Sequence, residues 1–246
     1  MSTVATKTYP VLEVFGPVVQ GEGPVAGQVT HFVRLGLCDY RCSWCDSMFA
    51  VEPAEVKEHA EHLSVEQIVN RLEDRHPAPW VTLSGGNPAI HDLHELVAEL
   101  HDCGFFVAVE TQGSKWRPWL VDTDMLIVSP KPPSSGMVSD RHRVETERFM
   151  RFAEMSQGPL ERAIKIVVFD ERDLLWADAF MVEWPWPRLY LSVGTDVPYE
   201  DEGLDFTRRK VCDRYRWLCE KVPYLRSEVT VYPQLHVLAY GHTRGV

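Results

Sequence analysis

Short apolar runs rich in β-branched residues recur along the chain with amphipathic segments between them, and this alternation restricts the possible folds more than any other feature. Runs of strand length occupy residues 30–35, 81–84, 105–110, 125–128, 164–169, 189–193 and 229–232. Apolar strands separated by helices are typical of parallel strands joined by crossover helices. The sequence therefore predicts an α/β protein, and its length of 246 residues fits a single domain spanning residues 1–246.

Two helix starts carry a recognisable signal. Ser64 is followed three residues later by Gln67, and Asp92 is followed by Glu95. Both are capping-box patterns, in which the first side chain caps the helix and the second reaches back to the cap residue. We therefore expect one helix to begin after Ser64 and another after Asp92, the second ending near Gly104.

Composition and charge exclude several classes of protein. A net charge of -11 argues against a broad phosphate-binding surface, so nucleic acid is not an expected partner. No apolar run reaches the length of a membrane span and the N-terminus has no signal-peptide core, so we expect a cytoplasmic protein without a membrane partner. Residues 50–63 and 194–203 are polar and are expected to be solvated insertions. Three scattered cysteines, Cys103, Cys212 and Cys219, are expected to be small buried apolar residues in a reducing compartment.

Unusual residues follow four of the predicted strands. These segments are the cysteine loop after residues 30–35, Gly85-Gly86-Asn87-Pro88, Thr111-Gln112-Gly113 and Ser129-Pro130-Lys131. The alternating pattern fits either an open doubly wound sheet or a complete or partial barrel. A barrel gathers its active site at the carboxyl ends of its strands, where all four segments lie. We therefore favour a partial β/α barrel of the TIM type.

Three cysteines within eight residues, Cys38, Cys42 and Cys45, form the strongest chemical motif. Three thiolates can bind three irons of a cubane cluster and leave the fourth iron open. The alternatives are a zinc site that takes His31 or Asp46 as a fourth ligand, and three unrelated buried thiols. Structural zinc sites usually show a second pair of Cys or His ligands, so the spacing favours the iron–sulfur cluster.

The cysteine loop and the glycine pair together resemble the radical S-adenosylmethionine (SAM) superfamily. Its motif Cys-x-x-x-Cys-x-aromatic-Cys is matched with Trp44 at the aromatic position, and its Gly-Gly-Glu-Pro motif is matched by residues 85–88. By itself, the glycine pair would indicate only a tight turn. The resemblance implies a radical SAM partial barrel with a 4Fe-4S cluster that binds SAM. Asn87 replaces the usual acid: its oxygen can accept a hydrogen bond from the SAM ammonium group but brings no countercharge.

Further motifs resemble one family, the 7-carboxy-7-deazaguanine synthases (QueE). They lie at residues 13–23, 32–34, 44–47, 84–89, 110–113, 129–135, 233–236 and 244–246, so the resemblance covers nearly the whole chain. It implies a lyase that contracts the ring of 6-carboxy-5,6,7,8-tetrahydropterin to 7-carboxy-7-deazaguanine with loss of ammonia. The reaction would be initiated by a 5′-deoxyadenosyl radical from SAM and would belong to queuosine or 7-deazapurine biosynthesis.

The resemblance also implies roles for individual residues. The substrate would contact Val19, Gln20, Gly21, Arg34, Ser84 and the terminal carboxylate of Val246. The cofactor site would comprise Trp44, Cys45, Asp46, Gly86, Asn87, Ser129, Pro130 and Lys131, with Cys38, Cys42 and Cys45 on the cluster and Ser47 on Mg²⁺. On the residues alone, Gln20 and Gly21 could form an ordinary turn, Ser47 could be a loop hydroxyl and Arg34 a structural ion pair. For Arg34 we favour the substrate carboxylate, which its forked guanidinium fits.

Partners follow from the same resemblance. A flavodoxin or ferredoxin would supply the electron, and the protein would be a homodimer, with the aromatic run at residues 184–186 as one contact. Chain ends are usually frayed, but the resemblance reaches the last residue and implies that the tail folds into the active site. His236 is a weaker candidate for the same pocket. The nearest rival is a glycyl-radical activase, which shares the cluster loop but lacks the motifs at the two ends of the chain.

Overall fold

The computed structural model describes residues 6–156, 161–195 and 203–245. Its strands are β1 (Tyr9–Val19), β2 (Val29–Leu35), β3 (Glu61–Leu63), β4 (Trp80–Gly85), β5 (Phe106–Thr111), β6 (Met125–Val128), β7 (Glu161–Val168), β8 (Arg188–Val193) and β9 (Val229–Tyr232). They form one nine-stranded sheet in the order β3-β1-β2-β4-β5-β6-β7-β8-β9. Neighbouring strands from β2 to β9 are parallel, whereas β1 pairs antiparallel with both β2 and β3.

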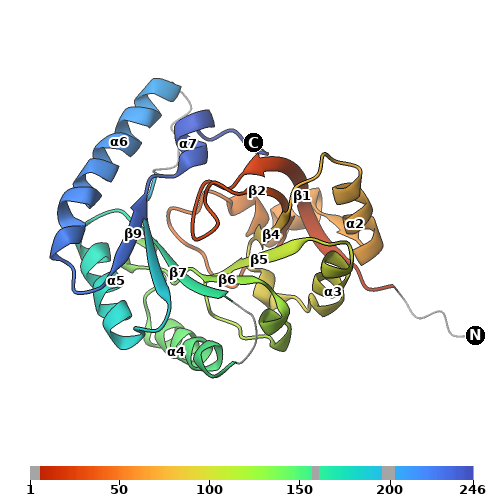
Figure 1. Ribbon diagram of the computed structural model, residues 1–246, viewed down its shortest axis with the longest axis horizontal. Coiled ribbons are helices and arrows are strands. Elements are labelled where there is room, and N and C mark those ends of the chain that lie inside the picture. The colour runs from red at the N-terminus through yellow and green to blue at the C-terminus, as the bar shows by residue number, and fades with distance from the viewer. Residues whose placement is uncertain (1–5, 157–160, 196–202, 246) are drawn as a thin grey trace, which may run out of the picture.

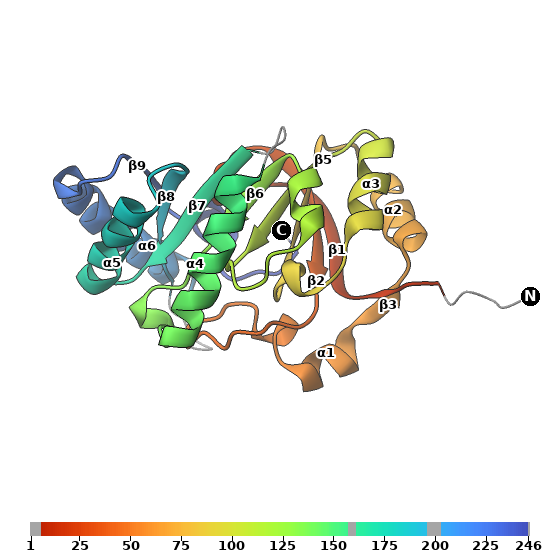
Figure 2. The ribbon, with the colours of Figure 1, turned by 90° about the horizontal axis from the view of Figure 1, so that it is seen from below.

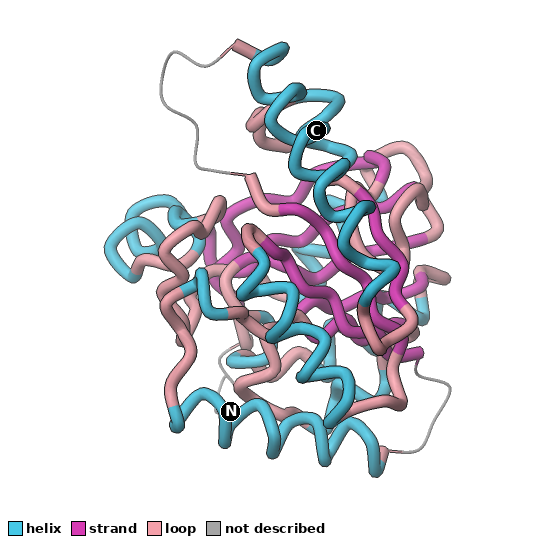
Figure 3. Tube along the Cα trace, turned by 90° about the vertical axis from the view of Figure 1, so that its left-hand side faces the viewer, coloured by secondary structure: helices cyan, strands magenta, loops and turns pink. Residues whose placement is uncertain are grey.

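The helices surround this sheet. They are α1 (Pro53–His59), α2 (Val65–Glu73), α3 (His94–Asp102), α4 (Asp140–Met155), α5 (Glu171–Glu183), α6 (Leu204–Lys221) and α7 (Leu235–Tyr240). Viewed in Figure 1, the strands form a curved wall with α2 to α6 around its outside, and Figure 3 shows the same arrangement from the side. The edge strands β3 and β9 do not pair with each other. The sheet is therefore a partial barrel, as predicted, and not a flat doubly wound sheet.

The apolar core lies mainly between the sheet and the helices. Val33 and Leu35 of β2 are fully buried there together with Leu72 of α2 and Leu96 of α3. A second, smaller cluster of apolar side chains comprises Val25, Ala108, Met125, Ile127 and Ala163. Side chains alternate between the two faces of a strand, so the remaining positions on the inner face are free to carry polar groups.

The predicted strands are confirmed, with small shifts at their ends. Strand β1 was not predicted. Residues 50–63 were expected to be a solvated insertion, and most of them are exposed, but the segment also contains the end of the short 3₁₀ helix η1 (Met48–Ala50), α1 and β3. The side chains of Ala50, Val56 and Leu63 are buried within this segment and anchor it. Of the other expected insertion, residues 196–202 lie outside the described residues.

One of the two capping boxes forms. The Ser64 side chain accepts a hydrogen bond from the Gln67 backbone, and the Gln67 side chain accepts one from the Ser64 backbone. The second prediction is wrong: α3 begins at His94 with Leu93 as its N-cap. One oxygen of the Asp92 carboxylate accepts a hydrogen bond from Lys7 at 2.8 Å, and the other lies 3.5 Å from the backbone nitrogen of His94. A long-range ion pair thus competes with the local cap.

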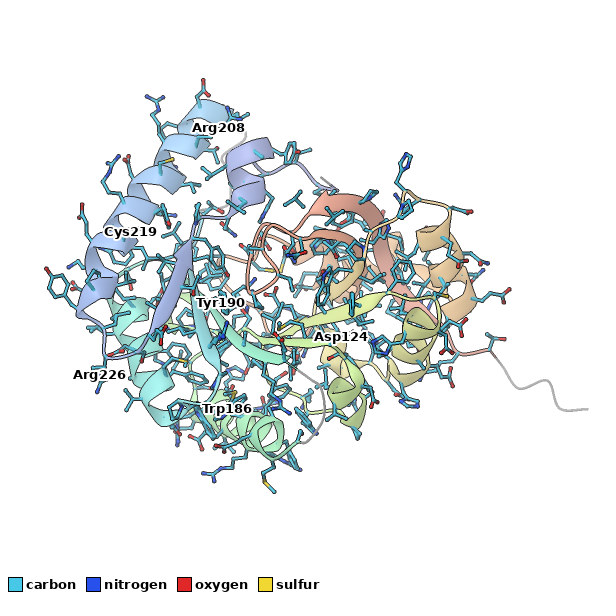
Figure 4. All side chains as sticks on the ribbon, viewed as in Figure 1. Asp124, Trp186, Tyr190, Arg208, Cys219 and Arg226 are labelled. Atoms are coloured by element: carbon cyan, nitrogen blue, oxygen red, sulfur yellow. The ribbon has the colours of Figure 1, made fainter. Side chains whose placement is uncertain are left out.

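Two predictions about burial are also wrong. Cys103, Cys212 and Cys219 are exposed, because they lie on the outward faces of their helical segments; Figure 4 labels Cys219 on α6 at the periphery. Trp184 is buried and Trp186 packs against the core, so this run does not offer the apolar surface predicted as a dimer contact. In the described part of the chain, no helix has the length and apolar character needed to span a membrane.

Candidate active site

The cysteine loop leaves the carboxyl end of β2 and turns back toward η1. Leu37 has a positive φ of 73°, and its backbone N–H donates to the Ala50 carbonyl at 2.8 Å. The segment between β2 and α1 lies at one end of the barrel, as Figure 2 shows. Cys42 is buried, and Cys38 and Cys45 are partly buried. Burial raises the pKa of all three thiols, that of Cys45 to about 11, so a bound metal must displace their protons.

Cys38, Cys42 and Cys45 are all free thiols. Among the described residues, no group of three His, Cys, Asp or Glu side chains is arranged to hold one metal ion. A four-iron cluster takes one thiolate on each of three irons, so its ligands need not converge on one point. His31, the zinc ligand considered above, is fully buried and makes an edge contact with the ring of Phe105, with ring centroids 6.2 Å apart.

Gly85 and Gly86 bring the end of β4 directly against the start of the cysteine loop. A Cβ on Gly85 would lie 2.1 Å from the Leu35 carbonyl oxygen, and one on Gly86 would lie 2.0 Å from that of Leu37. The Gly86 N–H donates to the Leu35 carbonyl at 2.9 Å. The glycine pair is therefore needed for close packing of the two backbones, and this packing already uses the Gly86 N–H, which the sequence motif suggested would be free for a ligand.

Asn87 is fully buried and lies at the centre of a hydrogen-bonded network of polar side chains. Its Oδ1 accepts hydrogen bonds from Thr111 Oγ1 at 2.7 Å and from the Ala89 backbone at 3.2 Å. Its Nδ2 donates to Asp39 Oδ1 at 2.9 Å and to Ser114 Oγ at 3.1 Å. Both acceptor positions of Oδ1 are filled, so in this structure the oxygen is not available for the direct contact with an ammonium group expected from the sequence.

Gln112 joins this network to the cysteine loop. Its Nε2 donates to Asp39 Oδ1 at 2.6 Å and lies 3.7 Å from Cys38 Sγ. The ends of β4 and β5 are thereby tied to the residues around the first cysteine. We name the side chains of Asn87, Thr111, Gln112, Ser114 and Asp39 the amide network.

The predicted cofactor residues on the other side of the loop come together. The Trp44 indole N–H donates to Ser134 Oγ at 3.0 Å, and its ring lies 5.2 Å from that of Phe169. Lys131 Nζ lies 5.7 Å from the centre of the Trp44 ring and donates to Ser129 Oγ at 3.0 Å. An aromatic surface, a cation and a buried hydroxyl are thus arranged beside the cysteines.

Glu13, Arg34 and Ser84 form a row across three neighbouring strands. Arg34 is in register with Glu13 of β1 and with Ser84 of β4. Arg34 Nε donates to Glu13 Oε2 at 2.7 Å, and its NH1 lies 3.4 Å from Ser47 Oγ. The structural ion pair considered for Arg34 is therefore present. The ion pair with Glu13 uses Nε, and NH1 and NH2 lie outside it. Ser47 Oγ donates to Asp46 Oδ1 at 2.8 Å.

The N-terminal motif follows the end of β1 and contacts the start of α7, where the Leu235 N–H donates to the Gly21 carbonyl at 3.2 Å. Gln20 is buried and its Oε1 accepts a hydrogen bond from the Glu22 backbone at 3.2 Å, whereas Val19 is exposed. Gly21 packs against His236 so closely that a Cβ on it would lie 2.4 Å from Nδ1 of that ring. Ser84 Oγ is buried without a hydrogen-bond partner among the described residues. Val246, predicted to contact substrate, lies outside the described residues.

Sequence reasoning missed a charged cluster that includes Lys165 of β7. Its Nζ lies 2.5 Å from Glu22 Oε2 and 2.6 Å from Glu110 Oε1, and only 5% of its side chain is exposed. Gln234 Nε2 donates to the second oxygen of Glu22 at 2.5 Å, and the Gly23 N–H donates to the Tyr232 hydroxyl. We name Lys165, Glu22, Glu110, Gln234 and Tyr232 the lysine cluster. A lysine within an apolar strand that is buried on both faces was the available signal, because such a charge requires partners.

The lysine cluster is strongly coupled by charge. Burial alone would raise the pKa of Glu22, but the Lys165 ammonium lowers it to about 2. Burial alone would lower the pKa of Lys165, but Glu110 and Glu22 raise it well above its ordinary value. Burial also raises the pKa of Tyr232. Lys165 and Glu22 therefore hold their charges at neutral pH.

Comparisons with known proteins show the family of the chain. The chain is 38% identical to 7-carboxy-7-deazaguanine synthase of Bacillus cereus over 243 residues, covering 96% of this chain and 98% of that protein. It is 36% identical to the synthase of Bacillus subtilis over 246 residues, covering 98% and 99%. Among solved structures, QueE from Escherichia coli is similar, with a TM-score of 0.64 at 22% identity over 92% of this chain and 94% of that chain. No protein-family model matches.

An unclosed parallel sheet whose first parallel strand leads into a three-cysteine loop defines a radical SAM enzyme. Streptococcus suis SuiB, solved with S-adenosylmethionine bound, shares the fold at a TM-score of 0.51 and 14% identity, over 83% of this chain and 50% of that chain. Within this class, the chain belongs to the 7-carboxy-7-deazaguanine synthase family, a family of lyases. The family predicted from the sequence motifs is confirmed.

Proposed function

We propose that the protein converts 6-carboxy-5,6,7,8-tetrahydropterin to 7-carboxy-7-deazaguanine with loss of ammonia. The two Bacillus relatives that carry this synthase name match nearly the whole chain, which supports the reaction. The observation that carries the assignment within this structure is the row of Glu13, Arg34 and Ser84 across β1, β2 and β4, next to Ser47 of the cysteine loop.

The row provides the groups that a carboxylated pterin requires. Glu13 holds Arg34 by its Nε, so the remaining N–H groups of the guanidinium fork are available for the substrate carboxylate. The Ser84 hydroxyl, buried and without a partner in the described structure, offers a donor and an acceptor on the adjacent strand. Gln20 supplies an amide for the pterin edge, which presents both donors and acceptors.

The residues around the cysteine loop fit an iron–sulfur cluster and SAM. Three free thiols on one loop suit three irons of a cluster, and Gly86, held beside the cysteine loop by its bond to Leu35, would contact the amino-acid portion of SAM. Trp44 would stack on the adenine, and Ser129, Pro130 and Lys131 would bind the ribose and carboxylate side. When bound, these cofactors would supply a carbon radical that removes a hydrogen atom from the substrate. Asn87 would hold the loop through the amide network.

Ser47 would bind Mg²⁺ together with substrate oxygens and water. One protein hydroxyl is a sparse ligand set, but Mg²⁺ usually keeps several waters and is held partly by its substrate. Ser47 Oγ lies between the Arg34 guanidinium and the Asp46 carboxylate, where a metal-bound substrate carboxylate would also contact Arg34. A flavodoxin or ferredoxin would reduce the cluster.

The decisive experiment is an anaerobic assay with protein reconstituted with iron and sulfide. We expect a deazaguanine chromophore that requires the carboxypterin, SAM, a reductant and Mg²⁺. Cleavage of SAM without this product would leave the radical SAM class intact and contradict the substrate. It would instead favour an activase, and an assay with a glycyl-radical partner protein would then test that reading.

Arg34 offers a sharper test of the site. Arg34→Lys keeps the charge but loses the fork, so we expect KM for the carboxypterin to rise by about tenfold or more, because a charged hydrogen bond contributes about 1.5 kcal/mol or more. Arg71→Lys is the matched control, since Arg71 makes a two-atom pair with Glu61 on the exposed surface away from this row. An unchanged KM in the Arg34 variant would contradict the role.

A further inference from the structure

Glu13 binds two arginines that come from opposite ends of the chain. Its Oε2 accepts from Arg34 Nε at 2.7 Å. Its Oε1 accepts from Arg244, from NH2 at 2.8 Å and from Nε at 3.1 Å. Both carboxylate oxygens are therefore occupied, one by the strand that carries the proposed substrate arginine and one by the C-terminal tail.

Phe49 provides a second attachment for the tail. The Arg244 guanidinium carbon lies 3.4 Å from the centre of the Phe49 ring, within the range of a cation–π contact. Phe49 belongs to η1, which follows directly after Cys45, Asp46 and Ser47. Arg34 lies 5.6 Å from the same ring. Arg244 therefore joins the tail to β1 and to the cysteine loop at once, and Figure 1 shows the C-terminal end beside β1 and β2.

We propose that Glu13 is a positioning residue that couples the C-terminal tail to Arg34, and that Arg244 fastens the tail over the substrate-binding row. The proposal rests on the proposed function for the identity of the ligand. It adds a link between the C-terminal tail and Arg34, made by Glu13, that the sequence motifs alone do not reveal. One carboxylate sets both the orientation of the substrate-binding guanidinium and the position of the chain end.

Burial supports this coupling. The side chains of Glu13 and Arg34 are each 18% exposed, so their pairing is partly shielded from water, whereas the Arg244 side chain is 56% exposed. A shielded carboxylate with two cationic partners restrains both more strongly than an exposed pair does. The tail is thus attached at a partly buried anchor by a side chain that can itself detach into solvent.

The docking of the tail is tested without any cofactor or substrate. In the folded protein, carboxypeptidase should remove C-terminal residues about fivefold faster from Glu13→Gln than from the native chain, because a part-buried ion pair and a cation–π contact together hold the tail. This variant leaves the tail sequence unchanged, so the enzyme meets the same substrate peptide. Glu61→Gln is the control, because it removes the carboxylate partner of Arg71 on the exposed surface and should not change the rate.

Coupling between the two residues is tested by combining variants. Arg244→Gln alone should speed tail removal to a similar extent, and the double variant should be no faster than either single one. Arg244→Lys should restore part of the protection, since it keeps the charge and loses the flat fork. Arg244 is exposed on the tail, so its variants keep the folded core even if Glu13→Gln does not.

Steady-state kinetics test whether Glu13 positions Arg34 and the tail. Arg244→Gln should raise KM for the carboxypterin about fivefold with little change in kcat, because it loosens the tail and leaves Arg34 paired. Glu13→Gln should raise KM further, because it also releases Arg34. Equal tail removal in the native and Glu13→Gln proteins, or additive effects in the double variant, would overturn the coupling. If tail protection behaves as expected and no deazaguanine forms, the proposed function fails while the attachment stands.

Discussion

The protein contains two polar networks that satisfy their buried groups in different ways, one mainly by hydrogen bonds between neutral side chains and the other by ion pairs. The amide network is built from side chains that are neutral apart from Asp39, and its central residue, Asn87, uses all its hydrogen-bonding capacity. The lysine cluster places one ammonium between two carboxylates inside the barrel. Leaving a buried neutral group without its hydrogen-bond partner costs about 1 to 3 kcal/mol, whereas leaving a buried charge unpaired costs about 3 to 5 kcal/mol. The first network can hold a loop in place, and the second can fix the barrel interior electrostatically.

The largest expected effect comes from breaking the lysine cluster. Lys165→Met leaves Glu22 and Glu110 without their cation, and we expect the free energy of unfolding to fall by about 3 to 5 kcal/mol. Urea unfolding of the cofactor-free protein, followed by tryptophan fluorescence, measures this. The control is Lys221→Met, whose ammonium pairs with Glu171 at 3.1 Å on the surface and should cost less than about 1 kcal/mol. Equal losses in the two variants would contradict the charged role.

The second prediction is that only the lysine cluster makes a contribution to stability that depends on pH. The pKa of Glu22 is lowered from 4.5 to about 2, so the pair stabilises the folded state above pH 4.5 and this contribution disappears as the pH falls toward 2. The stability difference between the native protein and Glu22→Gln should therefore shrink over this range. Urea titrations at several pH values measure it. The difference for Asn87→Leu should stay nearly constant, and a parallel decline would contradict the distinction.

The third effect is smaller and belongs to the amide network. Asn87→Leu removes four hydrogen bonds at a fully buried position and should lower the free energy of unfolding by about 2 to 3 kcal/mol. The iron content after reconstitution should also fall, since Asn87 and Gln112 hold Asp39 beside the first cysteine. Undiminished iron binding would show that the loop does not depend on the network.

The smallest effect is the loss of one bond. Thr111→Val keeps the shape of the side chain and removes the 2.7 Å bond to Asn87, so we expect a loss of about 1 kcal/mol by urea unfolding. Thr243→Val serves as the matched control, because the exposed Thr243 hydroxyl donates to the Tyr240 carbonyl and its loss should be barely measurable. A loss above that of Asn87→Leu would contradict the assigned order.

The sequence predicted the sheet well where local pattern and burial agree. The runs that form β2, β4, β5 and β6 are apolar because both faces of a parallel strand are covered, and their positions were predicted closely. Strand β1 was not recognised: it pairs antiparallel at one side of the barrel and most of its residues are only partly buried, so it lacks a continuous apolar run. The helix predicted after Asp92 begins slightly later, at His94, and the Asp92 carboxylate is shared between the His94 backbone at 3.5 Å and Lys7, far away in sequence, at 2.8 Å.

The residues of the candidate site also fall into two groups: those that short sequence motifs reveal and those that only the fold brings together. The cysteines, the glycine pair and Arg34 could be found in the sequence, because their chemistry is legible in short motifs. The lysine cluster could not, since Glu22, Glu110 and Lys165 lie on three distant segments and only the curved sheet brings them within ion-pair distance. Asn87 was identified, but its saturation by neighbours depends on where Thr111 and Ser114 fall.

By itself, the sequence determined the cysteine loop, its neighbouring motifs and the family to which the chain belongs. Those features are short-range, because ligand spacing and backbone freedom are properties of consecutive residues. The tertiary structure alone decided which charges are paired and which hydroxyls are left available. The physical reason is that burial and ion pairing depend on distances between strands. Glu13 shows this most clearly, since residues 21 and 231 positions away meet on its two oxygens.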